Sequence, residues 1–280
     1  MRNNIFDILN QNTNLYNDAN RLVIMFESEE LLYANYEEYN LIDFVNEYCF
    51  KEWKMRGHCI DVDDFLKTAD FDFYSKDAKC NIESQFILIE LIYNLWVLAN
   101  NKLLKDKTKY QWFGNFYHLR DVMNDILEKN NHTIYFDKKN ECLIVIENKP
   151  EVSAVVEILP DTNLAIDTIR YNHHSLKGNI GLKKSILLKL CLELEAKRKE
   201  LEKINRSISD DIFFLLNKLN IRHNNVSTNH KSNYIEYVAN MDITELEEWY
   251  DELYQMILLA FLLLDNKNRD TKIKKLKENI

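Results

Sequence analysis

Apolar residues recur at three- and four-residue steps along most of the chain, which is the spacing of one face of an α-helix. The steps predict helices over 40–57, 81–101, 113–129, 182–206, 209–223 and 244–265. Two short β-rich runs, 132–136 and 142–146, flank a polar turn and predict a hairpin. We expect a short helix and a loop between 61 and 79. The fold class is therefore mainly α.

The helix pair between 207 and 265 carries the clearest signals for helix ends. Ser209 is a favourable N-cap for the first helix, and Asn224-Asn225 is expected to stop it, because Asn tolerates the left-handed conformation found after a helix. The second helix is expected to start at Asp242 or Thr244, each of which has a Glu three residues later. Between the two helices lies a polar loop.

The stretch 256–264 is apolar on all sides. Its nine residues, and the longer apolar run in 81–101, are shorter than a bilayer span as the pattern delimits them. The end of the second helix is therefore expected to be a central core helix or one side of a subunit interface. No membrane partner is expected.

The change from helical to alternating period suggests the domain organisation. We predict a helical N-terminal module over 1–130, a β-hairpin connector over 131–149 and a helical bundle over 150–280, with Pro150 in the first turn of the helix after the hairpin. The hairpin could equally be a small β wing on a single domain.

Composition narrows the class of protein. With 46% hydrophobic residues in 280, the chain can bury a sizeable core, while 4 glycines and the absence of G-x-G-x-x-G disfavour a nucleotide-binding Rossmann unit. The five scattered cysteines lack Cys-x-x-Cys spacing, and the first residues lack the composition of a signal or transit peptide. We expect a reduced, cytoplasmic protein that uses no metal ion or cofactor.

Charge is unevenly distributed. The net charge is −9, yet residues 170–231 hold 13 Lys and Arg against 6 Asp and Glu. A basic sector on an acidic body suits a site for a polyanion. A solvated helix face with alternating charges explains the same count equally well, since Glu195 with Lys199 and Glu202 with Arg206 have i,i+4 spacing.

A candidate reactive cluster lies in the polar loop: Arg222, His223, Asn224 and Asn225, followed by His230. An imidazole can move a proton and a guanidinium can neutralise charge on phosphorus, so such a set could cut a phosphodiester without a metal. RNA carries its own nucleophile, the 2′-hydroxyl. In the alternative interpretation Arg222 pairs with an acidic residue and caps the preceding helix, and both histidines are solvated.

The segments 170–178, 221–225 and 249–265 resemble bacterial abortive-infection proteins that carry a HEPN-like C-terminal domain. The resemblance covers roughly residues 130–270. It implies a helical bundle, homodimerisation and metal-independent RNA cleavage in phage defence. It makes Arg222 the motif arginine, His223 the polar residue after it and His230 the catalytic histidine. The gap of seven residues between Arg222 and His230 is longer than the family's, which leaves His223 as an alternative base.

Secondary contacts to RNA are expected from the loop residues and from a few residues outside it. The expected substrate-binding residues are Asn224, Asn225, Lys218, Tyr171 and His173. His173 and His174 are adjacent and point to different helix sides, so they make a poor metal pair. A non-catalytic HEPN-like sensor that binds a phage component or an antitoxin-type partner protein is the alternative function.

Overall fold

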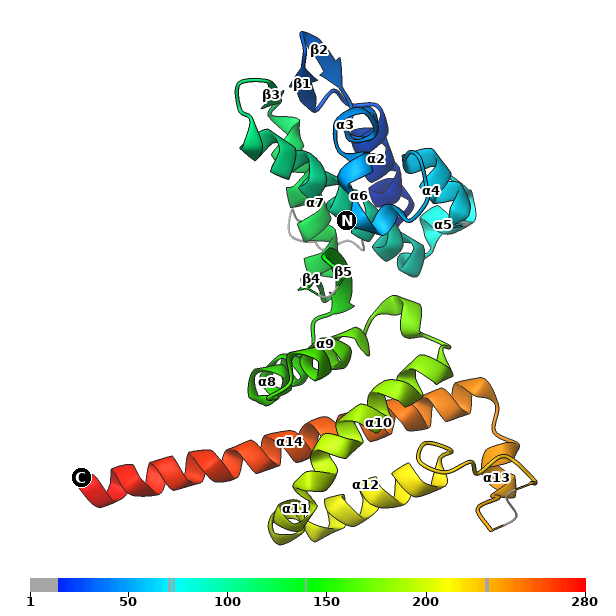
Figure 1. Cartoon of the computed structure of the whole chain (residues 1–280), viewed down its shortest axis with the longest axis vertical. Coiled ribbons are helices and arrows are strands. Elements are labelled where there is room, and N and C mark those ends of the chain that lie inside the picture. The colour runs from blue at the N-terminus through cyan, green and yellow to red at the C-terminus, as the bar shows by residue number, and fades with distance from the viewer. Residues whose placement is uncertain (1–14, 70–71, 73, 139, 230–231) are drawn as a thin grey trace, which may run out of the picture. The chain divides into compact units, whose positions relative to one another are not determined.

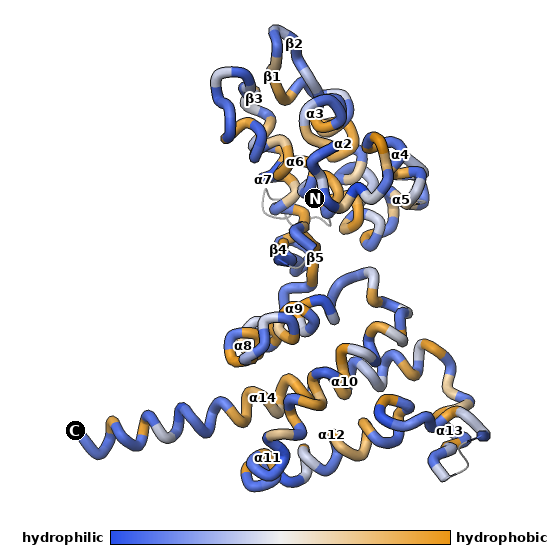
Figure 2. The backbone as a smooth tube through the Cα atoms, in the orientation of Figure 1, coloured by the Kyte–Doolittle hydropathy of each residue, from blue (hydrophilic) through white to orange (hydrophobic). Residues whose placement is uncertain are grey.

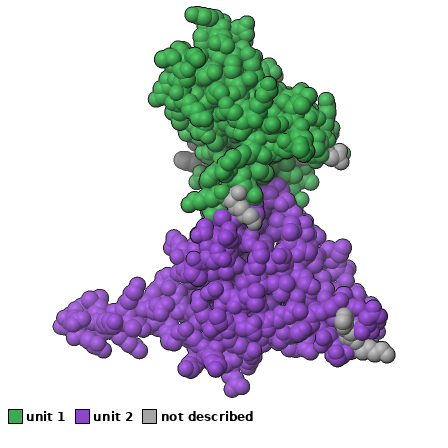
Figure 3. Space-filling view, viewed as in Figure 1, with its two compact units in different colours: residues 1–148 green, residues 149–280 purple. Residues whose placement is uncertain are grey.

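The computed structural model describes residues 15–280 apart from 70, 71, 73, 139, 230 and 231, and it is mainly helical with two small antiparallel sheets (Figure 1). The chain forms two compact units, residues 1–148 and 149–280, coloured separately in Figure 3. The hairpin that we expected to form a separate connector belongs to the first unit.

The first unit is built on one long helix surrounded by shorter elements. In chain order its elements are α2 (Leu15–Glu27), β1 (Leu32–Ala34), β2 (Glu37–Tyr39), α3 (Leu41–Tyr48), the 3-10 turns η1 (Phe50–Glu52) and η2 (Lys54–Arg56), α4 (Val62–Thr68), α5 (Lys76–Cys80), α6 (Ile82–Lys105), β3 (Tyr110–Trp112), α7 (Asn115–Lys129), β4 (His132–Asp137) and β5 (Cys142–Glu147). Asn40 and Asn81 cap α3 and α6, because each side chain accepts hydrogen bonds from first-turn N–H groups.

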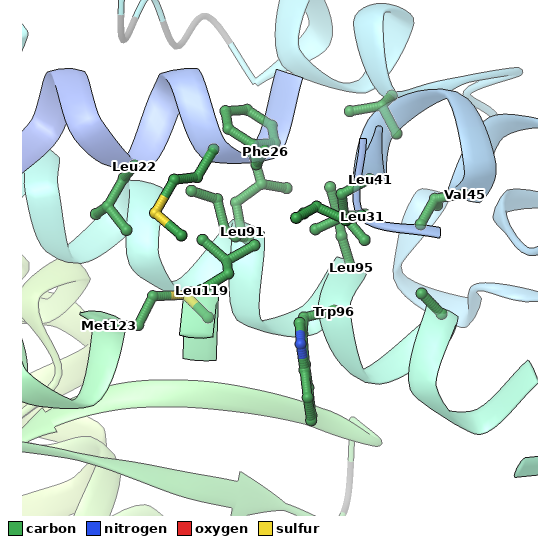
Figure 4. Close-up of a cluster of buried hydrophobic side chains, with 14 of the residues drawn as sticks. Leu22, Phe26, Leu31, Leu41, Val45, Leu91, Leu95, Trp96, Leu119 and Met123 are labelled. Carbon is green, nitrogen blue, oxygen red and sulfur yellow. The ribbon is translucent and has the colours of Figure 1, made fainter. Parts of the chain in front are cut away.

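Helix α6 has 24 residues and is longer than the apolar pattern alone delimited. Among the described residues it is the helix with the length and composition to cross a membrane. Its apolar side chains are instead packed in the core of the first unit, where Leu91, Leu95 and Trp96 belong to one buried cluster with Phe26 of α2 and Leu119 of α7 (Figure 4). The burial indicates a core helix.

Two polar residues inside α6 attach the hairpin to it. The Asn94 side chain donates to the Leu143 carbonyl at 2.8 Å and accepts from the Leu143 N–H at 2.9 Å, while Glu90 accepts from the Val145 N–H at 2.8 Å. These groups satisfy backbone groups of β5 that β4 does not reach. Both residues are therefore hydrogen-bonded within the first unit.

A three-stranded sheet, in the order β2-β1-β3, is absent from the sequence prediction. Its strands have three residues each, too few for an alternating pattern to be recognised. Asn35 and Tyr36 join β1 to β2, and their φ values of 50° and 69° are those of a type I′ turn. The third strand, β3, pairs antiparallel with β1, and Trp112 of β3 lies opposite Leu32 of β1.

The second unit is helical. Its elements are α8 (Pro150–Ile158), α9 (Thr162–Arg170), the 3-10 turn η3 (His174–Leu176), α10 (Ile180–Ala196), α11 (Arg198–Ile204), α12 (Arg206–Lys218), α13 (Glu236–Ala239) and α14 (Ile243–Asn279). Helix α14 packs against α8, α10, α11 and α12. Figure 2 shows its apolar part where it crosses α10, and a mostly polar tail beyond. The cap Asp242 and the position of Pro150 are confirmed.

Several predicted helix boundaries in the second unit were wrong. Helix α12 starts after Asn205, and Ser209 is buried inside it. The predicted helix 182–206 is interrupted at Lys197, so the i,i+4 pairs that span the ends of α10 and α11 are replaced: Glu195 pairs with Arg222 and Glu202 with Arg198. Helix α14 continues to Asn279.

Candidate functional site: the Arg222 loop

The loop after α12 begins with a well-defined helix end. Asn220 has φ +56°, the left-handed conformation that stops a helix, so the stop lies four residues earlier than expected. The Arg222 N–H donates to the Leu216 carbonyl at 3.0 Å, and the Tyr250 hydroxyl of α14 donates to the Leu219 carbonyl at 3.2 Å. The last carbonyls of α12 are thus satisfied, and the direction in which the chain leaves the helix is fixed.

Asn225 holds the loop in shape. Its side chain accepts from the Asn220 N–H at 3.0 Å and donates to the Asn233 carbonyl at 2.8 Å, and its own N–H donates to the Asn220 side chain at 3.3 Å. With 2% exposure, Asn225 has no surface for a substrate. The expected substrate-binding role is therefore replaced by a structural one.

We expect Asn225→Ala to lower the free energy of unfolding by about 1–3 kcal/mol, because it leaves buried backbone groups of the loop without partners. Asn224 is the matched control: it is exposed, and within the described residues its side chain makes one hydrogen bond, which it accepts from the Ser227 N–H at 3.0 Å. Asn224→Ala should change stability by less than about 0.5 kcal/mol. Urea unfolding followed by circular dichroism tests this, and equal effects of the two substitutions would contradict the assignment.

Arg222 points toward α10. Its Nη2 donates to the Sγ of Cys191 at 2.9 Å and to the carboxylate of Glu195, and the guanidinium lies over the ring of Phe213 at 5.3 Å. Within the part of the chain that the structure describes, its Nη1 and Nε make no hydrogen bond, and the side chain is 19% exposed. The guanidinium is therefore held through one nitrogen, Nη2, and by its contact with the Phe213 ring.

Cys191 serves as a neutral neighbour in this cluster. Burial raises the pKa of its thiol, and the nearby Arg222 opposes that rise only in part. A thiol with a raised pKa is protonated at neutral pH and is a weak nucleophile. The chemistry available here is that of Arg222 and the loop histidines.

His223 and Asn224 follow Arg222 directly and are exposed. Lys218, in the last turn of α12, is exposed as well. His230 lies outside the described residues. The structure therefore places a fixed cation, an imidazole and a further exposed cation on one helix end.

A basic groove between α11 and α12 lies close to Arg222. It measures about 600 Å³ and is lined by Arg198, Lys199, Glu202, Lys203, Arg206 and Asp210. Arg198 and Arg222 share one support, because the guanidinium of Arg198 lies 4.3 Å from the Phe213 ring on which Arg222 also rests. Two of the four cations in the groove are paired with acids that also line it, Arg198 with Glu202 and Arg206 with Asp210. The sequence placed these residues in a basic sector without locating the groove.

Tyr171 and His173 lie elsewhere. Tyr171 is buried, stacks on Tyr254 with ring centroids 3.9 Å apart and donates to Asp251 at 2.9 Å. His173 forms the N-cap of η3, where its Nδ1 accepts from the Ser175 N–H at 3.2 Å. The lysine that meets Tyr171 stands twelve residues before Glu195 on α10, a rise of roughly 18 Å. These residues are not brought to Arg222.

That lysine, Lys183, is the centre of a buried charge network that the sequence analysis missed. It is 5% exposed and lies 2.7 Å from the Glu247 carboxylate and 2.6 Å from Asp251, with its ammonium 5.1 Å from the ring of Tyr171. The Gly178 N–H also donates to Glu247 at 2.9 Å. Glu247, Asp251 and Tyr171 all contact Lys183, so the network joins α10 to α14 and to the end of α9. We assign it a structural role.

A signal for the network is present in the sequence. Lys183 stands on the same helical stripe as Ile186, Leu187, Leu190 and Leu194, which are all buried. On α14, Glu247 and Asp251 stand four residues apart beside the buried Tyr250 and Tyr254. A lysine on an apolar stripe opposite two acids at helical spacing predicts a buried ion pair.

The comparisons with known proteins do not extend these observations. No family model matches the chain, and no curated protein or solved structure matches it either.

Proposed function

We propose that the second unit is a HEPN-type bundle that cleaves RNA without a metal ion at the Arg222 loop. The observation that supports this best is the state of Arg222. Its guanidinium is held at Nη2 by Glu195 and Cys191, its Nη1 and Nε make no hydrogen bond to the described residues, and it stands beside the exposed His223. A fixed guanidinium is suited to a phosphate, because little is lost in ordering it.

The chemistry requires one proton acceptor, one proton donor and a cation. An imidazole of the loop, His223 or His230, takes the proton of a ribose 2′-hydroxyl, and the 2′-oxygen attacks the adjacent phosphorus. The 5′-oxygen leaves with a proton from a second donor, and a cyclic phosphate remains. Arg222 neutralises the charge that builds on the phosphoryl oxygens. The basic groove that contains Arg198 and Lys203 binds neighbouring phosphates of the strand.

The cellular role proposed here, phage defence in the cytoplasm, follows from the resemblance to abortive-infection proteins. In that role the acidic first unit senses the infection or regulates the second unit.

We expect the purified chain to cleave a mixed pool of single-stranded and structured RNAs in the presence of EDTA. Arg222→Ala should slow cleavage by about 10²–10³-fold, the usual effect of removing one charge-stabilising group. Of His223→Ala and His230→Ala, the substitution that removes the working base should cost about 10²–10⁴-fold. Gel analysis of the end groups should show cyclic phosphates.

The chain offers matched controls for each substitution. Arg21→Ala removes an exposed arginine of the first unit, and His58→Ala removes an exposed histidine of the same unit. Both should retain cleavage. Cleavage that is unchanged in Arg222→Ala, with circular dichroism showing equal folding, would remove the loop as the site.

A second candidate function has one specific observation in its favour. Glu195 neutralises the positive charge of Arg222, as expected for an arginine with a purely structural task. In that case the unit is a non-catalytic sensor that binds a phage component or a partner protein. Glu195→Gln separates the two functions: it should tighten RNA binding if Arg222 meets phosphate, and leave RNA binding unchanged if it does not.

A further inference from the structure

The first unit contains a pocket between the turn that holds η2 and helix α4, which Figure 1 labels. It measures about 450 Å³, and small-molecule sites measure about 300–1,000 Å³. Apolar atoms in its lining come from Met55, Phe65, Thr68 and Ala69. The Phe65 ring packs against the buried Trp53, with ring centroids 4.8 Å apart, so this wall is held in place. The pocket can therefore receive the apolar part of a small molecule.

Arg56 lines the same pocket and is held through two of its nitrogens. Its Nε donates to the Lys51 carbonyl at 3.3 Å, and its Nη1 donates to the Cys59 carbonyl at 2.9 Å. Its Nη2 makes no hydrogen bond to the described residues, and none of their carboxylates forms an ion pair with it. A guanidinium that is already ordered binds a carboxylate at a small cost in side-chain entropy. Arg56 therefore gives the pocket a fixed positive charge.

Asp64, in the first turn of α4, gives the pocket a charge of the opposite sign. Its carboxylate accepts a hydrogen bond from the Ile60 N–H at 3.0 Å. Within the part of the chain that the structure describes, no lysine or arginine forms an ion pair with Asp64. Arg56 and Asp64 thus line one pocket without pairing with each other. A cation and an anion that stay apart in this way are complementary to a ligand that carries both charges.

The two charges select among classes of small molecule. A simple organic anion would bring its charge near Asp64, and a simple amine would bring its charge near Arg56, and like charges in one site repel. An uncharged apolar molecule would take water from both side chains and replace none of their hydrogen bonds. A free α-amino acid carries a carboxylate and an ammonium on one carbon. An apolar side chain on that carbon matches the apolar wall.

We propose that this pocket binds a free α-amino acid with an apolar side chain. Arg56 binds the α-carboxylate, Asp64 binds the α-ammonium, and the side chain of the ligand lies against Phe65. All of these residues belong to the first unit, so the proposal does not depend on RNA cleavage by the second unit.

Isothermal titration calorimetry of the full chain with L-leucine, L-methionine and L-phenylalanine tests the site. At least one should bind with a dissociation constant below about 1 mM. Two analogues of the tightest ligand then follow, one without the amine and one without the carboxylate; for L-leucine these are 4-methylpentanoate and 3-methylbutylamine. Each should bind at least about tenfold more weakly, because it leaves one protein charge without a partner. The proposal fails if none of the three amino acids binds, or if either analogue binds as tightly.

Substitutions assign each charge to its contact. Asp64→Asn keeps an acceptor for the Ile60 N–H and should remove the preference for the amino acid over the analogue without the amine. Arg56→Ala should remove the preference over the analogue without the carboxylate. Lys54→Ala is the control and should keep both preferences, because Lys54 pairs with the exposed Glu141 and does not line the pocket.

Circular dichroism checks that each variant is folded. If Arg56→Ala does not fold, Arg56→Lys, which keeps the charge but not the planar fork, should reduce the same preference in part. Preferences that match the wild type in folded Asp64→Asn and in the folded Arg56 variant would overturn the proposal.

Discussion

Replacing Lys183 with alanine is expected to lower the free energy of unfolding of the second unit by about 3–5 kcal/mol, the usual cost of removing one partner from a buried ion pair. The substitution leaves the carboxylates of Glu247 and Asp251 facing each other beside the ring of Tyr171 without a cation. Hydrogen exchange of peptides from α10 and α14 measures the loss in this unit.

Two further variants show whether charge is the cause. Lys183→Met keeps the length of the side chain and should remain strongly destabilised, because the acids still lack their partner. Lys184→Ala removes the neighbouring lysine, which is only partly buried, and should cost less than about 0.5 kcal/mol. If Lys183→Met were as stable as the wild type, packing rather than charge would explain the loss.

The effect of Lys183 should also depend on pH in a defined direction. Burial by itself would raise the pKa of Glu247, but the hydrogen bonds from Lys183 and from the Gly178 N–H outweigh burial and hold that pKa below its ordinary value. A carboxyl with a lowered pKa stabilises the fold above its unfolded pKa, about 4.3, and loses this contribution as pH falls through the folded value. The difference between wild type and Lys183→Ala should therefore shrink in acid. A difference that stayed constant from neutral pH to about pH 3 would contradict this.

Trp96→Ala should destabilise the first unit by about 3–5 kcal/mol, the range for removing a buried tryptophan. The indole is 6% exposed, donates to the Phe116 carbonyl at 2.8 Å and stacks on the Phe116 ring with centroids 5.0 Å apart. It also meets Tyr117 edge-on at 5.8 Å. The substitution removes these contacts and leaves a cavity between α6 and α7. Urea unfolding and exchange of α6 peptides measure the loss.

Trp96→Phe separates packing from hydrogen bonding at the same position. It keeps an aromatic ring and leaves the Phe116 carbonyl without its donor, so a smaller loss of about 1–3 kcal/mol is expected. Trp112 is the control because it is 43% exposed, and Trp112→Ala should cost less than Trp96→Ala. Equal costs at the two positions would mean that α6 is not the centre of the core.

Local chemistry along the chain determined the helices and several of their ends. Asp242 caps α14, one of the two starts expected for that helix, because an N-cap hydrogen bond involves residues two or three positions apart. The hairpin of β4 and β5 was also predictable from its alternating pattern. The ends of α12 and α14 were not, since Asn205 competes with Ser209 for the cap and the tail of α14 has no apolar surplus.

At the candidate site, too, some features of the Arg222 loop were predictable from the sequence and others were not. The sequence identified Arg222 and His223 as adjacent residues of the candidate site, and the acidic partner that its alternative interpretation expected for Arg222 is confirmed as Glu195. The sequence could not show that Asn225 is buried. Its hydrogen bonds to Asn220 and Asn233 form only because the folded loop brings these residues together.

By itself the sequence determined the helical class, the hairpin and the residues available for chemistry, because these depend on neighbours within a few positions. Only the tertiary structure decided which residues meet across long separations. Lys183 binds Asp251, which is 68 residues away in the sequence, and Asn94 binds the backbone of Leu143, which is 49 residues away. Such pairs depend on how helices pack, and a pattern with a period of three or four residues carries no information about which helix faces which.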